Sequence, residues 1–242
     1  MSARFESLLA VDLDGTLVGD AASLAHLNRA IAPLRERVGI AYVTGRGLAS
    51  AQRLLQEEAL LTPDFLLTGV GTGIYRGPRW SPNPAWMRHL SRNWDGLRIR
   101  RLCEGFPALT PQPAACQGPF KCSYQLGRGE PTLTHLAEAL TRSRLGARLI
   151  YSSGRDLDVV PESAGKGNAV RFLALTLGIA ISSVLACGDS GNDLDMLSLG
   201  GPAAIVANAT PELVEGADSH VYRSNLSHAA GVLDALRHFG WL

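Results

Sequence analysis

Two aspartates separated by a single residue, Asp12 and Asp14, follow a short apolar run in the stretch LLAVDLDGTL, residues 8 to 17. Ligands of open α/β sheets bind beyond the carboxyl ends of the strands, so carboxylates in this position are candidates for chemistry. A solvated turn is the alternative, because Asp and Gly are common turn residues. A calcium loop fits poorly, since Leu17 and Ser23 would stand where that loop needs glycine and glutamate.

Three later segments carry further groups that bind anions or cations. They are Thr44-Gly45-Arg46 after the apolar run GIAYV, Lys166 within AGKGNA, and the hexapeptide GDSGND at 188–193. If the strand ends converge, the gathered carboxylates would repel one another strongly unless a cation were present. A hard divalent ion bound through oxygens, typically Mg²⁺, is the natural counter-charge. The same ion, a lysine and a hydroxyl would also hold a phosphate group.

The elements that would position these groups follow from the hydrophobic pattern. Short apolar runs rich in β-forming residues alternate with longer segments of helical periodicity. This predicts an α/β fold with a parallel sheet covered by helices on both faces. The expected strands are residues 8–11, 39–43, 64–68, 183–188, 203–206 and 220–222.

Between about residue 81 and residue 155 the sequence changes character. Prolines cluster there, and the strand candidates alternate apolar with polar residues, which indicates an inserted α+β domain. We expect a core domain made of residues 1–80 and 156–242, and an inserted domain made of residues 81–155.

Two segments of the insert have the pattern of half-buried strands. In KCSYQL, Lys121 and Ser123 share a face that we expect to meet water or a ligand, whereas Cys122 and Tyr124 share the packed face. The arginines of LRIRRL, residues 97–102, are expected to form a solvated strand face.

Composition limits the classes of partner. Of the 242 residues, 46% are hydrophobic and 19% charged, with a net charge of +1, so neither nucleic acid nor a membrane is an expected partner. The N-terminal segment lacks a signal-peptide pattern and no apolar stretch of about 18 residues occurs, so we expect a cytoplasmic protein. The four cysteines have spacings that suit neither a zinc site nor a disulfide framework, so we expect free thiols.

The motifs DLDGTL, TGR, a lysine in AGKG, and GDSGND occur in the order that is typical of the haloacid dehalogenase superfamily of phosphatases, which this sequence resembles from residue 8 to residue 193. The resemblance implies a Rossmann-like core. It also implies that Asp12 attacks phosphorus to form an aspartyl-phosphate, and that Asp14 protonates the leaving oxygen and then activates water. To hold a proton near neutral pH, Asp14 would need burial beneath a lid and a neighbouring carboxylate.

The same resemblance implies the ligands of phosphate and of the cofactor Mg²⁺. The phosphate would be bound by Thr44, Gly45, Lys166 and Asn192. The metal would be held by Asp12, the backbone carbonyl of Asp14, Asp189, and Asp193 through a water molecule.

The insert lies between the Thr44 and Lys166 motifs, as does the C2-type cap of this superfamily. FKCSYQL, SSGRDLDVVPESAGKGNAV, VANATPEL and SHAAGVLDAL look like sucrose-phosphate phosphatases of bacteria and plants. This similarity covers nearly the whole chain and implies hydrolysis of sucrose 6-phosphate to sucrose and phosphate. The residues expected to contact the sugar are Arg46, Gly71, Thr72, Lys121 and Ser123.

One departure leaves the sugar open. Gly73 stands where these phosphatases commonly carry an acidic residue, so another disaccharide or glycoside phosphate, such as mannosylfructose phosphate, is an alternative substrate. A phosphomutase and a non-catalytic sugar-phosphate-binding module are further alternatives, and the presence of both Asp12 and Asp14 disfavours the second. We expect a monomer that binds a small sugar phosphate, with a sugar-phosphate synthase upstream in the pathway as a conceivable associate.

Overall fold

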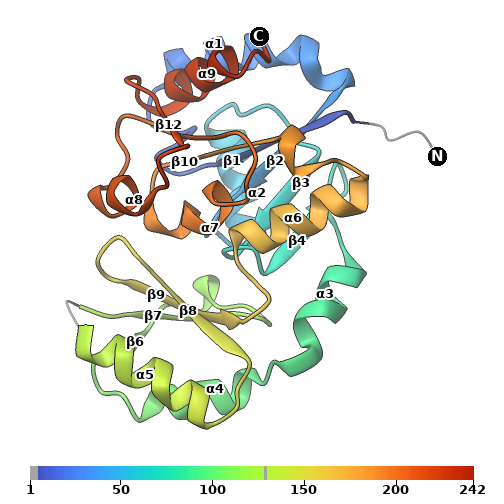
Figure 1. Cartoon of the computed structure of the whole chain (residues 1–242). Helices are drawn as coiled ribbons and strands as arrows, with labels where there is room; N and C mark the ends of the chain where they lie inside the picture. The colour runs from blue at the N-terminus through green and yellow to red at the C-terminus, as the bar shows by residue number, and fades with distance from the viewer. Residues whose placement is uncertain (1–4, 128–129) are drawn as a thin grey trace.

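The computed structural model describes residues 5–127 and 130–242 (Figure 1). Its larger sheet has eight strands in the order β12-β11-β10-β1-β2-β3-β4-β5. These strands are β1 (Ser7–Asp12), β2 (Val38–Val43), β3 (Phe65–Thr68), β4 (Gly73–Arg76), β5 (Ser81–Pro82), β10 (Val184–Gly188), β11 (Ala203–Ile205) and β12 (Tyr222–Arg223). Neighbours from β12 to β3 run parallel, whereas β4 and β5 add an antiparallel edge.

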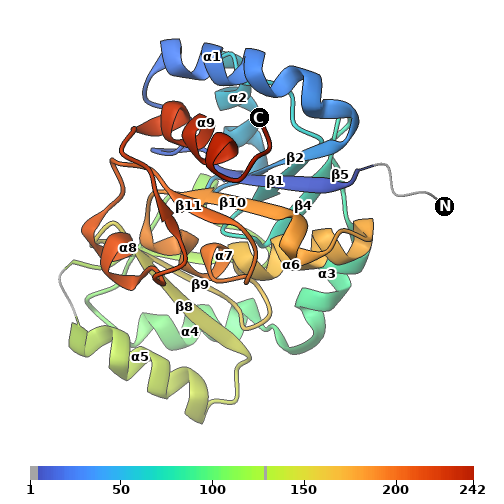
Figure 2. The ribbon, with the colours of Figure 1, turned by 45° about the horizontal axis from the view of Figure 1, so that its top comes forward.

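Both faces of this sheet are buried, because successive side chains of a strand point to opposite faces. In β1, Leu8 and Ala10 belong to one apolar core, and Leu9 and Val11 belong to the other. Helices α1 (Ala21–Ile31), α2 (Leu48–Glu57) and α9 (His228–His238) cover the face of Leu9 and Val11 (Figure 2). Helices α3 (Pro84–Leu90), α6 (Lys166–Leu177), α7 (Leu194–Leu197) and α8 (Pro211–Gly216) cover the face of Leu8 and Ala10.

The six strands expected from the sequence are all present, so the prediction of a parallel sheet with helices on both faces is confirmed. The last one begins later than expected, at Tyr222. The sequence did not indicate β4 and β5, because they follow a glycine-rich turn and are short. In that turn Gly69, Val70 and Gly71 all have positive φ, which ends the apolar pattern of β3.

A second, four-stranded antiparallel sheet has the order β6-β7-β9-β8. Its strands are β6 (Thr110–Pro111), β7 (Cys122–Gln125), β8 (Ala147–Ser152) and β9 (Asp156–Pro161). Helices α4 (Gly96–Glu104) and α5 (Glu130–Arg142) pack on the sheet face that points away from the larger sheet (Figure 1). This is an α+β arrangement.

The expected strand at 97–102 is wrong, because this segment lies within helix α4. Asp95 caps the helix by accepting the Arg98 N–H, and Ile99 and Cys103 are buried four residues apart. The arginines of the segment therefore lie on a helix, where the alternation of apolar and basic residues had suggested a strand.

The two sheets do not follow the expected domain boundaries, 1–80, 81–155 and 156–242. β5 pairs with the larger sheet although it begins at residue 81, and β9 pairs with the smaller sheet although it begins at residue 156. We therefore propose that the second domain begins after α3 and ends with β9. Residues 1–4 and 128–129 lie outside the described part of the chain.

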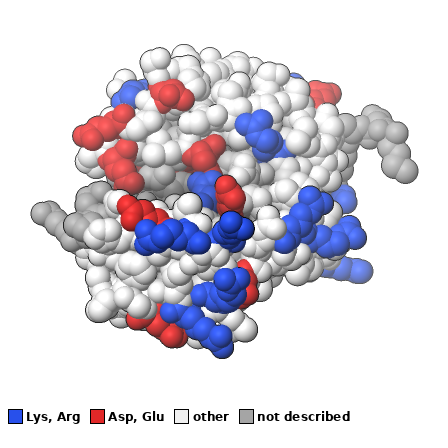
Figure 3. Space-filling model, turned by 60° about the horizontal axis from the view of Figure 1, so that its bottom comes forward, with Lys and Arg blue, Asp and Glu red and all other residues white. Residues whose placement is uncertain are grey.

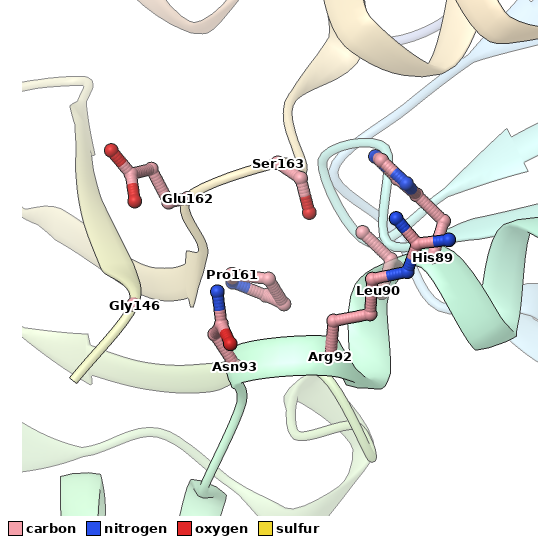
Figure 4. Close-up of a pocket in the computed structure, with 8 residues that line it drawn as sticks. All are labelled: His89, Leu90, Arg92, Asn93, Gly146, Pro161, Glu162 and Ser163. Carbon is pink, nitrogen blue, oxygen red and sulfur yellow. The ribbon is translucent and has the colours of Figure 1, made fainter.

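The two domains are joined by two connecting segments that lie beside each other. One runs from Leu90 to Asn93, and the other is Pro161–Ser163; a cavity of about 310 Å³ lies between them (Figure 4). Gly146, which precedes β8, closes one side of this cavity, and its carbonyl accepts the Glu162 N–H at 2.9 Å. Two chain segments therefore connect the domains, and a cavity separates them.

Basic and acidic side chains are interspersed on part of the surface. On the face shown in Figure 3, acidic side chains lie beside several of the basic ones. None of the described helices combines the length and the apolar character needed to span a bilayer. All four cysteines are free, as the sequence predicted.

Candidate active site

Three parallel strands at the centre of the larger sheet end at the same edge. Asp12 is the last residue of β1, Thr44 follows β2, and Asp189 follows β10. β1 lies between the other two. Successive strands extend to one side from β1 through β2 and β3 and to the other side from β10 through β11 and β12, and such a reversal of order forms a natural ligand crevice. The convergence expected from the sequence is therefore present.

Lys166 bridges two carboxylates at this edge. Its Nζ lies 2.6 Å from Asp12 Oδ1 and 2.6 Å from Asp193 Oδ1, and all three side chains are buried. Burial by itself would lower the pKa of Lys166, but the attraction of the two carboxylates outweighs this and raises that pKa. The lysine is therefore charged and fixed in place.

One lysine does not balance the acidic groups around it. Asp12, Asp189 and Asp193 each place a carboxylate oxygen within 4.8 Å of the others. Burial raises the pKa of Asp12 well above its usual range, against the attraction of Lys166. Burial, reinforced by the charge of Asp193, raises the pKa of Asp189 to about 6. If all three carboxylates are ionised, the single ammonium of Lys166 therefore does not neutralise them.

This donor set fits a divalent cation. Three buried carboxylates and one ammonium leave an excess of two negative charges, which an ion such as Mg²⁺ would neutralise. Carboxylate oxygens are also the ligands that this ion prefers. The carboxylate of Asp14 does not belong to this cluster, and binding of a metal by its backbone carbonyl remains a prediction.

The cluster is held by groups that the sequence did not single out. The Thr16 hydroxyl donates to Asp189 Oδ1 at 2.9 Å. Gly15 has a φ of 81°, and a Cβ at this position would collide with the Asp189 carboxylate. Asp193 Oδ2 accepts the backbone N–H groups of Asp189 and Ser190, both at 3.1 Å. These contacts fix the directions of both carboxylates.

Asp14 lies at the mouth of the site and not beneath a lid. Its side chain is 48% exposed and makes a bidentate ion pair with Arg46, whose Nε and Nη2 lie 2.7 and 2.6 Å from its two oxygens. Arg46 also donates to the Ser50 hydroxyl at 3.1 Å. The expected burial of Asp14 is therefore wrong for this structure, because the chain turns directly after Asp12 and carries the next carboxylate outward.

The remaining groups expected at the phosphate lie around the same edge. Thr44 is buried, and its hydroxyl oxygen accepts the Arg46 N–H at 3.1 Å. The Gly45 carbonyl accepts a hydrogen bond from Lys121 Nζ at 3.3 Å. Asn192 lies in the short helix η5 (Gly191–Asp193), directly before the acid that binds Lys166. Their contacts with phosphate remain a prediction.

The GVGTG loop supports the lysine. A Cβ on Gly71, whose φ is 80°, would collide with the carbonyl of Gly165, immediately before Lys166. The Gly71 carbonyl accepts the Trp86 indole N–H at 3.1 Å, and the Thr72 hydroxyl donates to the Gly69 carbonyl at 2.9 Å. In this structure the loop therefore packs against the segment that carries Lys166, and contact of Gly71 and Thr72 with a sugar remains a prediction.

Lys121 and Ser123 are buried, although we expected their face to meet water or a ligand. Both bind Asp158 of β9: Lys121 Nζ lies 3.2 Å from Oδ1, and the Ser123 hydroxyl donates to the same oxygen at 2.6 Å. This face of the smaller sheet turns toward the larger domain, which excludes water from it. A cavity of about 120 Å³ beside Lys121 extends to Gly73.

Two further groups hold the loop that follows Asp12 and Asp14. The Gly15 carbonyl accepts Asn208 Nδ2 at 2.8 Å and lies 2.9 Å from His228 Nδ1. His228 has a φ of 52°, an uncommon conformation for a residue other than glycine. Asn208 lies in VANATPEL and His228 lies in SHAAGVLDAL, two segments that carry the family resemblance. The sequence analysis nevertheless gave neither residue a role.

Comparison with known proteins matches nearly the whole chain. The sequence model of the sucrose-6F-phosphate phosphohydrolase family matches residues 5–240. Sucrose-phosphatase 1 of Nicotiana tabacum is 33% identical over 96% of this chain, which spans only 59% of the length of the tobacco protein. The mannosylfructose-phosphate phosphatase of Agrobacterium fabrum is 34% identical, with 96% of each protein covered.

Solved structures agree with these similarities. The sucrose-phosphatase of Synechocystis sp., in complex with sucrose and phosphate, is 37% identical and superposes with a TM-score of 0.91 over 98% of each chain. A haloacid dehalogenase-like hydrolase from Bacillus subtilis is only 16% identical but reaches a TM-score of 0.74 over all of this chain and 94% of its own. The haloacid dehalogenase fold expected from the sequence motifs is thereby confirmed.

Proposed function

The chain belongs to the sucrose-6F-phosphate phosphohydrolase family, and from this premise we propose that it is a Mg²⁺-dependent phosphatase that hydrolyses sucrose 6-phosphate to sucrose and phosphate. The observation that carries the proposal is the buried cluster in which Lys166 joins Asp12 to Asp193 next to Asp189. With Mg²⁺ offsetting its excess negative charge, such a cluster would suit a doubly charged phosphate ester, which needs positioning and neutralisation of its charge.

The reaction divides into two displacements. An Asp12 oxygen forms a bond to phosphorus while the bond to the sugar oxygen breaks, and Asp14 donates the proton that this oxygen takes up. Asp14 then accepts a proton from water, whose oxygen attacks phosphorus and releases phosphate with the Asp12 carboxylate restored. Lys166 orients Asp12 through the 2.6 Å ion pair, and Asp14 must release its ion pair with Arg46 before it can carry the proton.

Mg²⁺ would be held by Asp12, Asp189, the Asp14 carbonyl and, through water, Asp193. When bound, it supplies positive charge that offsets the charge on the phosphoryl oxygens. Thr44, Gly45 and Asn192 would bind the remaining phosphoryl oxygens, and Lys166 would do so beside them. All of these residues lie at one edge of the sheet, which supports their assignment to one phosphate.

The identity of the sugar is argued from two relatives, which favour different esters. The Synechocystis structure contains sucrose and phosphate, which favours sucrose 6-phosphate. The Agrobacterium relative, covered to 96%, acts on mannosylfructose phosphate by its name and favours that ester as the alternative. We propose that Arg46, Gly71, Thr72, Lys121 and Ser123 contact the sugar of either ester. The proposal includes a cytoplasmic monomer that acts downstream of a sugar-phosphate synthase.

The test is phosphate release from sucrose 6-phosphate, mannosylfructose phosphate, fructose 6-phosphate and glucosylglycerol phosphate, each with Mg²⁺ and with EDTA. We expect rapid release from sucrose 6-phosphate with Mg²⁺ and none with EDTA. Faster release from mannosylfructose phosphate would replace the substrate and keep the reaction. Failure to hydrolyse any of the four esters would refute the phosphatase.

The matched variant is Asp12→Asn, which keeps the size of the side chain and removes the nucleophile. We expect it to lose at least about 1,000-fold in kcat, because the first displacement cannot occur without a carboxylate. Circular dichroism should show a folded protein. If the variant kept more than a few per cent of kcat, Asp12 would not be the nucleophile.

A further inference from the structure

Arg148 connects the second domain to the segment that carries Lys166. It lies on β8, and its Nη1 donates to the Ala164 carbonyl of the larger domain at 3.2 Å. Its Nη2 lies 3.3 Å from Asp195 Oδ2 on α7. Ala164 is two residues before Lys166, and Asp195 is two residues after Asp193. One guanidinium therefore contacts both segments that flank the lysine ion pair.

Asp195 has a different partner for each of its oxygens. Oδ2 faces Arg148, whereas Oδ1 accepts the Gly167 N–H at 3.1 Å. Gly167 is in the first turn of α6, and its neighbour Lys166 begins that helix. Asp195 thus joins a side chain of the second domain to the backbone that aims Lys166.

The segment has little room to move between these contacts. Gly165 has a φ of 125°, and a Cβ there would collide with the Asp195 carboxylate and lie 2.9 Å from Arg148 Nη1. On its other side the Gly165 carbonyl meets Gly71. A displacement of Arg148 or Asp195 would therefore be passed on to Lys166, whose Nζ must stay within reach of Asp12.

We propose that Arg148 is a positioning residue: when the second domain is docked, its guanidinium, through Asp195 and the Ala164 carbonyl, sets the orientation of Lys166 toward Asp12. The proposal rests on the proposed function, since it assigns Lys166 a part in phosphoryl transfer. β8 also contacts η5, so this strand lies against both sides of the lysine site. The smaller domain thus contributes to the chemistry of the phosphate as well as to recognition of the sugar.

The test compares Arg148→Ala, Asp195→Asn and the double variant. Asp195→Asn retains an oxygen for the Gly167 N–H but removes the charge that Arg148 binds. We expect each single variant to lose about tenfold in kcat, and the double variant to lose no more than about twofold beyond the worse single, because both act through one link. Arg148→Lys should recover part of the loss.

Two controls separate positioning from simple closure or folding. Arg142→Ala removes the same charge from an exposed ion pair with Glu138 in the second domain and should leave kcat unchanged. The loss in Arg148→Ala should be equal for sucrose 6-phosphate and for p-nitrophenyl phosphate, because Lys166 contacts Asp12 and not the sugar. A loss confined to the sugar ester, or multiplicative losses in the double variant, would overturn the proposal.

Binding of inorganic phosphate, measured by calorimetry with Mg²⁺ present, gives a readout that does not need turnover. We expect Arg148→Ala to weaken this binding by about tenfold, and Arg142→Ala to leave it unchanged. If the parent protein hydrolysed no ester, the proposed function would fail while this measurement still decided the role of Arg148. Equal phosphate affinity in the parent and in Arg148→Ala would overturn that role.

Discussion

Asp12 and Asp189 lie beside Asp193 in a cluster with one buried ammonium, and burial raises the pKa of both Asp12 and Asp189. The pKa of Asp189, raised to about 6 from an ordinary value of 3.8, means that the folded state holds a proton more tightly than the unfolded state does. The contribution of Asp189 to the free energy of unfolding is therefore fully present below about pH 4, decreases as the pH rises, and is lost above about pH 6.

We therefore expect Mg²⁺ to raise the unfolding temperature more at about pH 7.5 than at about pH 5, because at the higher pH it relieves carboxylates that are ionised and uncompensated. Thermal unfolding followed by circular dichroism, with and without Mg²⁺, measures this. Asp189→Asn is the matched control and should reduce the difference. An equal Mg²⁺ effect at both pH values would contradict this view of the cluster.

Single residues were predictable from the sequence where the fold fixes them directly. Asp12, Thr44 and Asp189 each stand at or just beyond the end of a strand, so a correct strand pattern brings them together. Arg148 and Asp195 were not, because their link joins segments 47 residues apart in two different domains. Asp14 was expected to be buried but is exposed, because the extended backbone of β1 ends at Asp12.

At the scale of elements, the loop before α6 contains a glycine, Gly165, whose neighbours leave no room for a larger side chain. Gly165 and Gly178 flank this helix, with φ values of 125° and 73°. A Cβ at Gly165 would meet the Asp195 carboxylate, whereas nothing lies within 4 Å of a Cβ at Gly178, where the helix ends in a left-handed cap.

We expect Gly178→Ala to cost about 1 kcal/mol of unfolding free energy, the usual cost of a left-handed alanine. Gly165→Ala should cost more than about 2 kcal/mol, because strain and a collision act together. Urea unfolding of both variants gives the comparison. Similar costs for the two would show that the contacts of Gly165 add nothing to its backbone strain.

Some helices and strands were easier to predict from the sequence than others. The central strands are continuous apolar runs, because a parallel sheet is buried on both faces, and they were predicted closely. Helix α4 was taken for a strand, because a short basic segment with alternating apolar residues satisfies both periods. The pairing of β9 with the smaller sheet depends on its contacts with β7 and β8, which no local pattern reports.

At the scale of the whole molecule, two basic side chains of the second domain reach the first at different points. Lys121 contacts the Gly45 carbonyl, beside the cavity of about 120 Å³, and Arg148 contacts the segment that carries Lys166. Together with the two connecting segments beside the cavity of about 310 Å³, these contacts join the two domains.

We expect Lys121→Met to raise KM for sucrose 6-phosphate by about tenfold, because it removes a polar contact at the domain interface while keeping most of the unbranched apolar stem of the side chain. For p-nitrophenyl phosphate, which has no sugar, kcat/KM should change by less than about threefold. Steady-state kinetics with both esters measures the contrast. Equal losses would place Lys121 in phosphate chemistry and not in sugar recognition.

Both lysines of this sequence, Lys121 and Lys166, are buried at the domain interface, and every other basic residue among its 23 Lys and Arg is arginine. The surface is consequently almost inert to acylating reagents, which attack free amines. A mass-spectrometric label on Lys121 would record each separation of the two domains, without an engineered probe.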